Sequence, residues 1–334
     1  MTLSLPVAID AMGGDFAPSQ ILEGARQAVA AGIPVVLVGR SADLGDLAQL
    51  TALGISVIEA SEVIEMDDDP AKSIRTKKDS SLLRAAEAVR DGKASAFLSA
   101  GNTGATMASA LFRMGRVKSV IRPAIATPIP VIGSTPTVLL DAGANAECTA
   151  EMLVQFAQMG SSYARARYGM AAPRVGLLTI GEEDGKGNAL AKEANQLLRA
   201  GAAGDGVNFI GNVEGRDVMG TEVDVVVTDG FTGNIVLKTL EGGMKFFAGK
   251  VFEALLSTPE AKEAAKVLMP QLMPLAEALD PNTYGGAMLL GVDGVCIISH
   301  GSSNALAILN ASKVARDMVE VGLVAAIAAA VAKP

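Results

Sequence analysis

The sequence predicts an α/β fold in which helices cover both faces of a mostly parallel sheet. Short aliphatic runs alternate with segments of helical periodicity along most of the chain, as expected for strands that are buried on both sides. Each of these runs also ends in a turn rich in glycine and small polar residues. Because parallel strands end at a common edge of the sheet, we expect these turns to form one polar cleft there.

The predicted strands are the aliphatic runs that such a turn closes. In chain order they are Val7–Ala11, Ala96–Ala100, Val138–Leu140, Val175–Ile180, Val223–Val227 and Val295–Ser299. The turns that follow them span residues 12–15, 101–104, 141–145, 181–188, 228–234 and 300–304. Backbone N–H groups in glycine-rich turns can approach an anion closely, so these turns are candidate binding segments.

Segments of helical periodicity fill the gaps between the strands. We expect helices at residues 18–31, 43–52, 79–91, 104–115, 146–168, 189–200, 233–256, 259–279 and 304–330. No repeat, low-complexity tract or linker divides the chain, so residues 1–334 are predicted to form a single α/β domain.

Residues 242–281 differ from the rest of the chain. They predict a long helical pair with a turn near residues 257–259 and with Pro270 and Pro274 in the second arm. Its Met and Leu side chains suit an adaptable contact surface. Three interpretations remain open: packing on the sheet, a dimer arm, or an apolar tip that contacts a partner or a membrane surface.

The composition excludes several classes of protein. The formal net charge is −8, whereas nucleic-acid binding needs a basic face, so we expect no nucleic-acid partner. The longest apolar stretch, Val321–Ala332, is too short to cross a bilayer. The first ten residues lack a basic cluster and include an acid, so they predict a strand of a cytosolic protein and no signal peptide.

Several catalytic and metal-binding motifs are missing. The chain contains no P-loop, no Gly-x-Gly-x-x-Gly dinucleotide fingerprint and no Gly-x-Ser-x-Gly elbow. Cys148 and Cys296 lie far apart without metal spacing, so we expect free thiols. The acidic run at residues 65–69 precedes the basic residues of 72–78. We therefore interpret it as a solvated loop and helix start, and predict no metal site.

The loop after Val175–Ile180 is the most informative of the turns. It contains three glycines, three acids and Lys186, which lies between Gly185 and Gly187. Glycine-rich turns present backbone donors and a lysine adds a point charge, so Lys186 is a candidate phosphate ligand. A flexible surface loop with a solvated lysine has the same pattern, and the recurrence of the strand–turn unit favours the binding site.

Two further features carry charge or acid–base capacity. His300 is the only histidine and follows a strand; we interpret it as a hydrogen-bonded group at the rim of the cleft, and an acid–base role stays open. Besides the cations of residues 72–78, a second basic cluster has no acid between its members, which are Arg113, Arg116, Lys118 and Arg122. This cluster is either a solvated helix end or a landing site for an anionic partner or phosphorylated cofactor.

Together, these motifs resemble the PlsX family of phosphate acyltransferases. The matching stretches, in family order, are Ala8–Asp15, Asp79–Ser81, Ser99–Ala105, Asp141–Asn145, Gly181–Asn188, Thr228–Asn234 and His300–Asn304. The resemblance implies a three-layer α/β/α sandwich similar to isocitrate dehydrogenases and phosphotransacetylases, from which the helical pair protrudes as a hairpin.

The resemblance implies an enzyme that moves a fatty acyl group from acyl carrier protein to inorganic phosphate, giving acyl phosphate for phospholipid synthesis. It implies a homodimer without a metal or redox cofactor, since phosphopantetheine arrives bound to the carrier. It also implies a cytoplasmic protein that works at the membrane surface and passes acyl phosphate to a membrane glycerol-3-phosphate acyltransferase.

By motif, the resemblance assigns Lys186 and Asn234 to hold phosphate and the reacting carbonyl. The other residues expected to bind substrate are Gly13, Gly14, Asn102, Thr103, Gly104, Gly185, Gly187, Gly233 and His300. The cations Arg113, Arg116, Lys118 and Arg122 are expected to dock the acidic carrier protein. Direct attack of phosphate on a thioester needs no protein nucleophile, so catalysis would rest on positioning and on charge stabilisation at the carbonyl.

Three alternatives remain open at this point. The nearest is a phosphotransacetylase-like enzyme that uses acyl-CoA and phosphate, because its chemistry is the same. An NAD(P)-dependent decarboxylating dehydrogenase would share the implied fold, although the chain lacks a dinucleotide fingerprint. A non-catalytic membrane scaffold is supported only by the helical hairpin.

Overall fold

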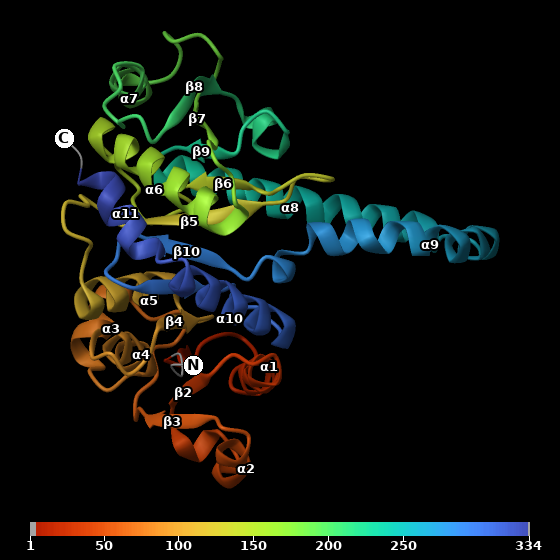
Figure 1. Cartoon of the computed structure of the whole chain (residues 1–334). Helices are drawn as coiled ribbons and strands as arrows, with labels where there is room; N and C mark the ends of the chain where they lie inside the picture. Colours follow the sequence, from red (N-terminus) through yellow and green to blue (C-terminus); the bar gives the residue numbers. More distant parts are fainter. Residues whose placement is uncertain (1–4, 333–334) are drawn as a thin grey trace.

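The computed structural model describes residues 5–332, which form an eleven-stranded sheet covered by helices (Figure 1). The strands are β1 (Val7–Asp10), β2 (Val35–Gly39), β3 (Ser56–Glu59), β4 (Ala96–Ser99), β5 (Ala124–Ile129), β6 (Thr137–Leu140), β7 (Arg174–Leu178), β8 (Asn208–Val213), β9 (Val225–Val227), β10 (Ala287–Leu290) and β11 (Val295–Ile298). Their order across the sheet is β3-β2-β1-β4-β11-β10-β5-β6-β9-β7-β8.

Two sets of parallel strands make up most of the sheet. The β1 set contains β3, β2, β1, β4 and β11, and the β6 set contains β6, β9, β7 and β8. Three successive antiparallel pairings, β11–β10, β10–β5 and β5–β6, connect the two sets. The strands of the β6 set therefore run opposite to those of the β1 set.

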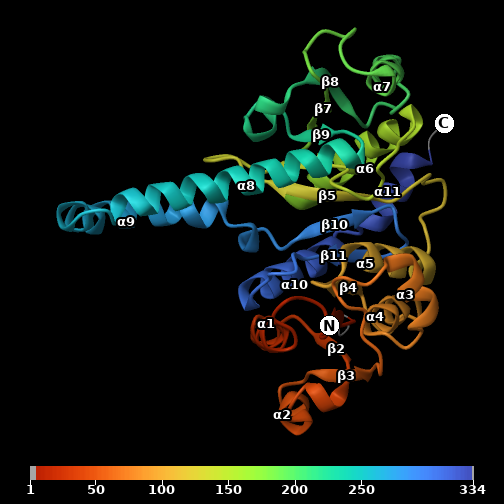
Figure 2. The same cartoon turned by 180° about the vertical axis from the view of Figure 1, so that it is seen from behind.

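Helices cover both faces of this sheet (Figures 1 and 2). They are α1 (Ser19–Ala30), α2 (Leu47–Ala52), α3 (Pro70–Thr76), α4 (Ser81–Arg90), α5 (Thr103–Ser109), α6 (Ala150–Tyr168), α7 (Ala189–Arg199), α8 (Gly230–Leu255), α9 (Pro259–Leu279), α10 (Ala305–Glu320) and α11 (Leu323–Val331). Helices α1, α6, α7, α10 and α11 share one core with the sheet, whereas α4, α5 and α8 pack on the opposite face. The predicted three-layer α/β/α sandwich is confirmed.

Alternate residues of each strand enter the two cores. In β2, Val35 and Leu37 belong to the core beneath α1 and α10, whereas Val36 and Val38 belong to the core beneath α4. Successive side chains of a strand point to opposite faces. A strand that is buried on both faces therefore needs aliphatic residues at every position, which explains the continuous runs in the sequence.

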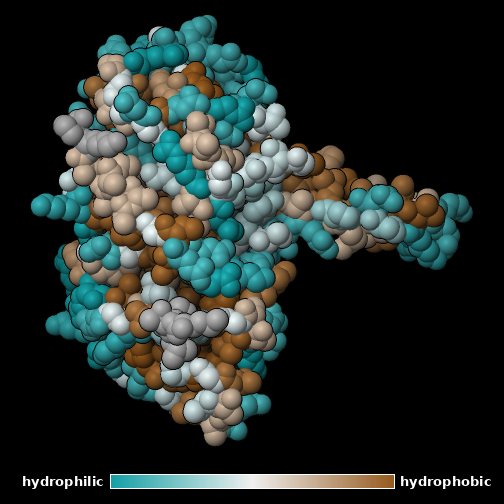
Figure 3. Space-filling model, in the orientation of Figure 1, coloured by the Kyte–Doolittle hydropathy of each residue, from teal (hydrophilic) through white to brown (hydrophobic). Residues whose placement is uncertain are grey.

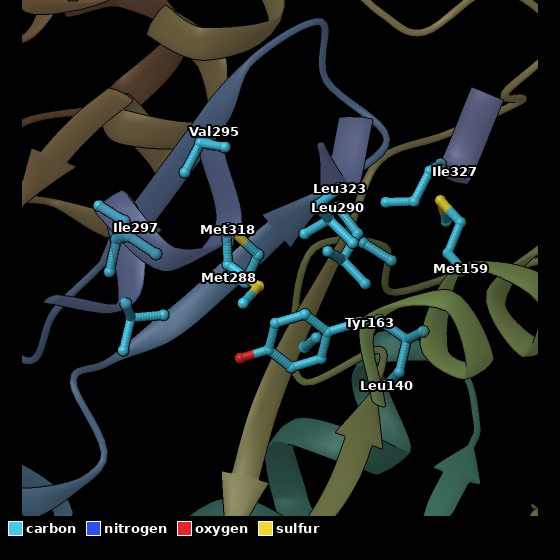
Figure 4. Packing of buried hydrophobic residues seen from close by; sticks show 14 of the residues in the cluster. Leu140, Met159, Tyr163, Met288, Leu290, Val295, Ile297, Met318, Leu323 and Ile327 are labelled. Atoms are coloured by element: carbon cyan, nitrogen blue, oxygen red, sulfur yellow. The ribbon is translucent and has the colours of Figure 1, made fainter. Parts of the chain in front are cut away.

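The core continues across the connection between the two strand sets (Figure 4). Tyr163 of α6 is 1% exposed and lies with Leu140 of β6 and Met288 of β10, and Leu323 of α11 packs in the same cluster. Aliphatic and Met side chains from both sets thus form one hydrophobic cluster, as expected for a chain with few aromatic residues.

The predicted helices agree well with the structure, with one clear exception. The segment 304–330 was expected to be one helix, but it forms α10 and α11. The break lies at Gly322, whose φ of +69° is left-handed, a conformation that suits glycine and ends a helix. The apolar run after Gly322 continues as α11, which packs on α6.

Helices α8 and α9 form a hairpin that projects from the body of the molecule (Figures 1 and 2). Large apolar side chains along it remain exposed, including Phe246 at 70%, Phe247 at 71% and Val267 at 75% (Figure 3). Pro270 and Pro274 lie inside α9. The protruding helical hairpin is confirmed, and its apolar surface faces solvent in the single chain.

Candidate active site

The glycine-rich turns form two groups because the two strand sets run in opposite directions. The turns after β1, β4 and β11 leave one end of the strands, and those after β6, β7 and β9 leave the other end. The expectation that all turns share one sheet edge is therefore wrong. The first group holds Gly13, Gly14, Asn102, Thr103, Gly104 and His300, and the second holds Gly185, Lys186, Gly187, Gly233 and Asn234.

The first group is organised around the buried carboxylate of Asp10 at the end of β1. Asp10 accepts hydrogen bonds from the Ser99 hydroxyl at 2.7 Å and from the Met12 N–H at 3.1 Å. Burial raises the pKa of Asp10, and these hydrogen bonds oppose that rise. A Cβ at Gly13 would lie 2.7 Å from the Gly101 nitrogen, so the two turns pack directly on each other.

The amide of Asn102 is also used within the protein. Its nitrogen donates to the carbonyls of Met66 at 3.0 Å and Asp68 at 3.1 Å. Its oxygen accepts the Ala105 N–H at 3.0 Å and thereby caps α5. Asn102 therefore joins the acidic loop to the helix start, with both ends of the amide engaged.

His300 lies at the surface of the first group. Its Nδ1 is 2.8 Å from the Ser302 hydroxyl, and the Ser302 N–H donates to the same nitrogen at 3.2 Å. Thr103 is exposed at the start of α5. His300 is therefore exposed and hydrogen-bonded to Ser302, at the end of the strands opposite to Lys186 and Asn234.

The second group is organised around Asp141, which follows β6 and is fully buried. Its Oδ1 accepts N–H groups from Ile125, Gly143 and Ala144 at 3.0, 3.1 and 2.9 Å. Its Oδ2 accepts the backbone and side-chain N–H groups of Asn145 at 2.8 and 2.9 Å. Burial raises the pKa of Asp141 against these donors, which fix the conformation of the turn.

The first turn of α8 packs tightly on this loop. The Gly230 N–H donates to the Asn145 carbonyl at 2.7 Å, and a Cβ at Gly230 would lie 2.6 Å from that oxygen. A Cβ at Gly233 would overlap the Asp141 carbonyl. Only glycine permits these approaches, so the spacing of Gly230 and Gly233 seats the helix start on the Asp141 turn.

Asn234 is exposed at this helix start. Its Nδ2 donates to the Ala142 carbonyl at 3.2 Å, and a Cβ at Gly143 would lie 2.8 Å from Nδ2. A side-chain amide has two N–H donors, and within residues 5–332 only Ala142 accepts from this one. Asn234 therefore offers a further donor next to the positive end of the α8 dipole.

Lys186 lies in the loop between β7 and α7. Its side chain is 49% exposed, with Nζ 3.9 Å from a carboxylate oxygen of Glu183, and its N–H donates to the Glu183 carbonyl at 2.9 Å. Gly187 has a φ of +97°, a conformation that favours glycine. The ammonium is therefore presented to solvent on a turn of defined shape.

Lys186 and Asn234 follow neighbouring strands. β7 pairs in parallel with β9, so the loop that carries Lys186 and the helix start that carries Asn234 leave the sheet side by side at the same end. The acids beside Lys186 have cationic partners: Arg216 lies 2.9 Å from Glu182, and Arg199 lies 2.9 Å from Asp184. Together, an ammonium and a helix-start amide suit an anion and a carbonyl that gains negative charge.

The basic cluster at residues 113–122 is only partly available to a partner. Arg113 lies 3.2 Å from Glu87, whereas Arg116, Lys118 and Arg122 are exposed and form no ion pair within the described chain. The segment leads into Pro123, whose carbonyl accepts the Asn145 side chain at 2.8 Å. The end of this segment therefore lies beside the Asp141 turn.

Residues 5–332 contain no group of three or more His, Cys, Asp or Glu side chains that could hold a metal ion. The acidic run behaves as a helix start: Asp69 caps α3, and Asp68 lies 2.5 Å from Lys77. In the same part of the chain, no helix is both long and apolar enough to cross a membrane.

Comparison with solved structures identifies the class of fold. The chain is similar to the EutD phosphotransacetylase from Staphylococcus aureus, with a TM-score of 0.60 over 95% of this chain and 94% of that chain. The sequence identity is 16%, so this likeness concerns the fold alone. The molecule is an α/β protein of the phosphotransacetylase architecture.

Comparison of sequences identifies the family. A family model described as fatty acid synthesis protein matches residues 5–326. A phosphate acyltransferase from Elusimicrobium minutum is 47% identical over 95% of this chain and 93% of its own length, and one from Geobacillus sp. is 46% identical over 94% and 95%. The chain belongs to this family of phosphate acyltransferases and is an acyltransferase, as its motifs indicated.

Sequence reasoning did not single out the two buried aspartates as site residues. Asp10 and Asp141 shape the two groups of turns, yet neither contacts solvent to any extent. A signal was present, because each is an acid that directly follows a run of at least three aliphatic residues. Such an acid is expected to collect the N–H groups of the following turn.

Proposed function

We propose that the protein transfers a fatty acyl group from acyl carrier protein to inorganic phosphate and so supplies acyl phosphate for phospholipid synthesis. The observation that carries this proposal is the placement of Lys186 and Asn234 on adjacent loops at one end of the β6 set. Membership in a family of phosphate acyltransferases supports the acceptor. The family assignment also argues against the dehydrogenase and the non-catalytic scaffold.

In this mechanism Lys186 and the backbone N–H groups around Gly185 and Gly187 bind phosphate. A phosphate oxygen bonds to the thioester carbon, the C–S bond breaks, and the thiolate of the donor takes up a proton from solvent. Asn234 donates its second N–H to phosphate or to the carbonyl oxygen as negative charge develops. No cofactor of the enzyme takes part, because phosphopantetheine belongs to the donor.

Carrier protein docks, in this proposal, on the exposed cations Arg116, Lys118 and Arg122. Two hydrogen bonds support the choice of surface. Gln155 of α6 donates its Nε2 to the Ser119 carbonyl at 2.8 Å, and its Oε1 accepts the Ile121 N–H at 2.7 Å. The segment is therefore anchored rather than loose. Arg113 contributes less than its neighbours, because Glu87 already pairs with it.

The hairpin suits the remaining roles that the resemblance implies. Exposed Phe246, Phe247 and Val267 are available to a second copy of the chain, to the acyl chain or to a membrane surface. We propose a cytoplasmic homodimer in peripheral contact with the membrane, where a glycerol-3-phosphate acyltransferase would take up the product. No nucleic-acid partner is proposed, given the net charge of −8.

Hydroxylamine trapping tests the reaction directly. Purified protein is mixed with phosphate and either acyl carrier protein or CoA bearing the same acyl group, and the acyl hydroxamate is measured. We expect hydroxamate to form faster from the carrier-bound donor and only when phosphate is present. Faster reaction of acyl-CoA would favour the CoA-dependent enzyme, and no hydroxamate from either donor would refute the proposal.

Charge reversal tests the docking surface. Arg116→Glu, Lys118→Glu and Arg122→Glu should raise the KM for carrier-bound donor and make the rate less sensitive to salt. A small acyl-pantetheine donor should react as before. Lys78→Glu is the matched control, because Lys78 is also exposed and forms no ion pair within residues 5–332. An unchanged KM in the triple variant would exclude this surface.

A further inference from the structure

The loop that carries Lys186 is held by a network of polar side chains that the reaction itself does not require. Asn212 of β8 donates its Nδ2 to the Glu183 carbonyl at 2.8 Å. The same carbonyl accepts the Lys186 N–H at 2.9 Å. Asn212 thus bonds to the peptide group that closes the turn around Lys186.

A second buried amide fixes the first. Asn195 of α7 donates its Nδ2 to Asn212 Oδ1 at 2.9 Å, and the two side chains belong to residues that are 2% and 7% exposed. This contact orients the Asn212 amide so that its nitrogen, not its oxygen, faces Glu183. Asn195 Nδ2 also lies 3.3 Å from Asp184 Oδ1, which ties the next residue of the loop to the same pair.

Arg199 anchors the loop from the end of α7. Its guanidinium donates to Asp184 Oδ1 from Nε at 3.2 Å and from Nη2 at 2.9 Å, and it lies over the Phe209 ring at 5.4 Å. Gly211 has a φ of +112°, and a Cβ there would lie 2.7 Å from Nη2. The absence of a side chain at Gly211, next to the register shift between β8 and β7, therefore leaves room for this arginine.

We infer that Asn195, Asn212 and Arg199 are positioning residues that set the affinity of the Lys186 loop for phosphate. The inference rests on the proposed function, because it concerns the loop that binds the acceptor. Two adjacent loop residues, Glu183 and Asp184, are bonded from β8 and α7, and the turn of Lys186 starts from the first of them. Removing these bonds frees the loop to sample other shapes, and fewer molecules then present the ammonium and N–H groups together.

The key variant is Asn212→Asp, which keeps the shape and replaces the donor by a second acceptor facing the Glu183 carbonyl. We expect the KM for phosphate to rise about tenfold, the usual effect of losing one well-placed hydrogen bond, with the KM for the acyl donor unchanged. At lower pH the buried carboxyl of the variant is protonated and donates again. The ratio of variant to parental phosphate KM should therefore fall toward one as the pH is lowered.

Two controls separate positioning from simple loss of stability. Asn208→Asp makes the same change on the same strand, at an exposed residue whose amide only meets the Ala172 carbonyl at 3.4 Å, and should leave the phosphate KM unchanged. Val223→Ala removes a buried methyl pair in the same half of the molecule and should lower the melting temperature without changing that KM. If Asn212→Asp does not fold, Arg199→Gln tests the exposed end of the network and should raise the phosphate KM several-fold.

An Asn212→Asp variant with parental phosphate KM at all pH values would overturn the inference, as would a KM that follows the melting temperature across all the variants. If Asn212→Asp does not fold, a parental phosphate KM of the Arg199→Gln variant would overturn the inference. Failure of the proposed function appears separately, as absence of acyl phosphate with the parental protein.

Discussion

The Asp10 and Asp141 turns begin alike and end differently. In each, a buried aspartate at the end of an aliphatic run accepts N–H groups from the turn that follows it, and Asp10 also accepts the Ser99 hydroxyl from the neighbouring strand β4. In the Asp10 turn the glycines pack against neighbouring backbone, and in the adjacent turn Asn102 donates both amide N–H groups to internal carbonyls. On the Asp141 turn, Gly230 and Gly233 seat the start of α8, whose Asn234 stays exposed.

From this difference we expect a strand–aspartate–glycine turn to act as a scaffold that does not by itself identify a binding site. What distinguishes Lys186 and Asn234 from Asn102 is that their polar groups remain exposed after the internal hydrogen bonds are made, whereas the Asn102 amide is buried and fully engaged. The comparison predicts that substitutions in the Asp141 group change catalysis, whereas those in the Asp10 group change stability.

The largest expected effect tests this division directly. Lys186→Ala and Asn234→Ala should each lower the rate of acyl phosphate formation about 10²–10³-fold, the usual loss for one donor to a developing charge. Asn102→Ala should leave the rate of the folded protein nearly unchanged and lower the free energy of unfolding by about 1 kcal/mol, as for other helix caps. Steady-state rates and urea unfolding measure the two quantities, and a larger rate loss for Asn102→Ala than for the other two would reverse the assignment.

A pair of glycine variants tests how tightly each loop is packed. Gly13→Ala adds a Cβ that meets the Gly101 backbone and should lower the free energy of unfolding by about 1–3 kcal/mol, as overpacking does. At Gly185 an added Cβ has no neighbour within 4 Å in the described chain, so Gly185→Ala should leave the free energy of unfolding unchanged. Equal unfolding midpoints in urea for the two variants would contradict the proposed difference in packing.

The smallest effect concerns the cysteine of each region. Burial raises the pKa of Cys148, next to the Asp141 turn, to about 11, and it also raises the pKa of the fully buried Cys296 in β11. Because a raised pKa keeps a thiol protonated, neither should react quickly with iodoacetamide at pH 7–8. Labelling of Cys148 should increase as the pH approaches 11, while Cys296 stays unlabelled; mass spectrometry distinguishes them, with circular dichroism at each pH as the control for folding.

Much of the fold could be predicted because it depends on local patterns. The aliphatic runs marked six of the strands, and α9 begins and ends at the predicted residues. The direction of the β6 set could not be predicted, because it depends on the antiparallel pairings of β10 and β5, two strands that were not among the predicted ones. That single unknown produced the expectation of one shared edge.

The exposed residues of the candidate site could be predicted from the sequence, but the buried residues that hold its loop could not. Lys186 and Asn234 lie in motifs that the sequence displays. Asn195 and Asn212 lie in no such motif, and the sequence around an asparagine inside a helix or strand does not indicate its hydrogen-bond partner. Their hydrogen bond joins residues that are adjacent only after β8 pairs with β7.

The long helix α8 has a mechanical consequence. Its 26 residues make a rod of about 39 Å, whose first turn is wedged against the Asp141 turn and whose far half stands clear of the body (Figure 2). Such a rod is fixed at Gly230 and Gly233, where its first turn packs on the Asp141 turn. A sideways displacement of the hairpin apex would therefore tilt the first turn of α8, which carries the Asn234 amide.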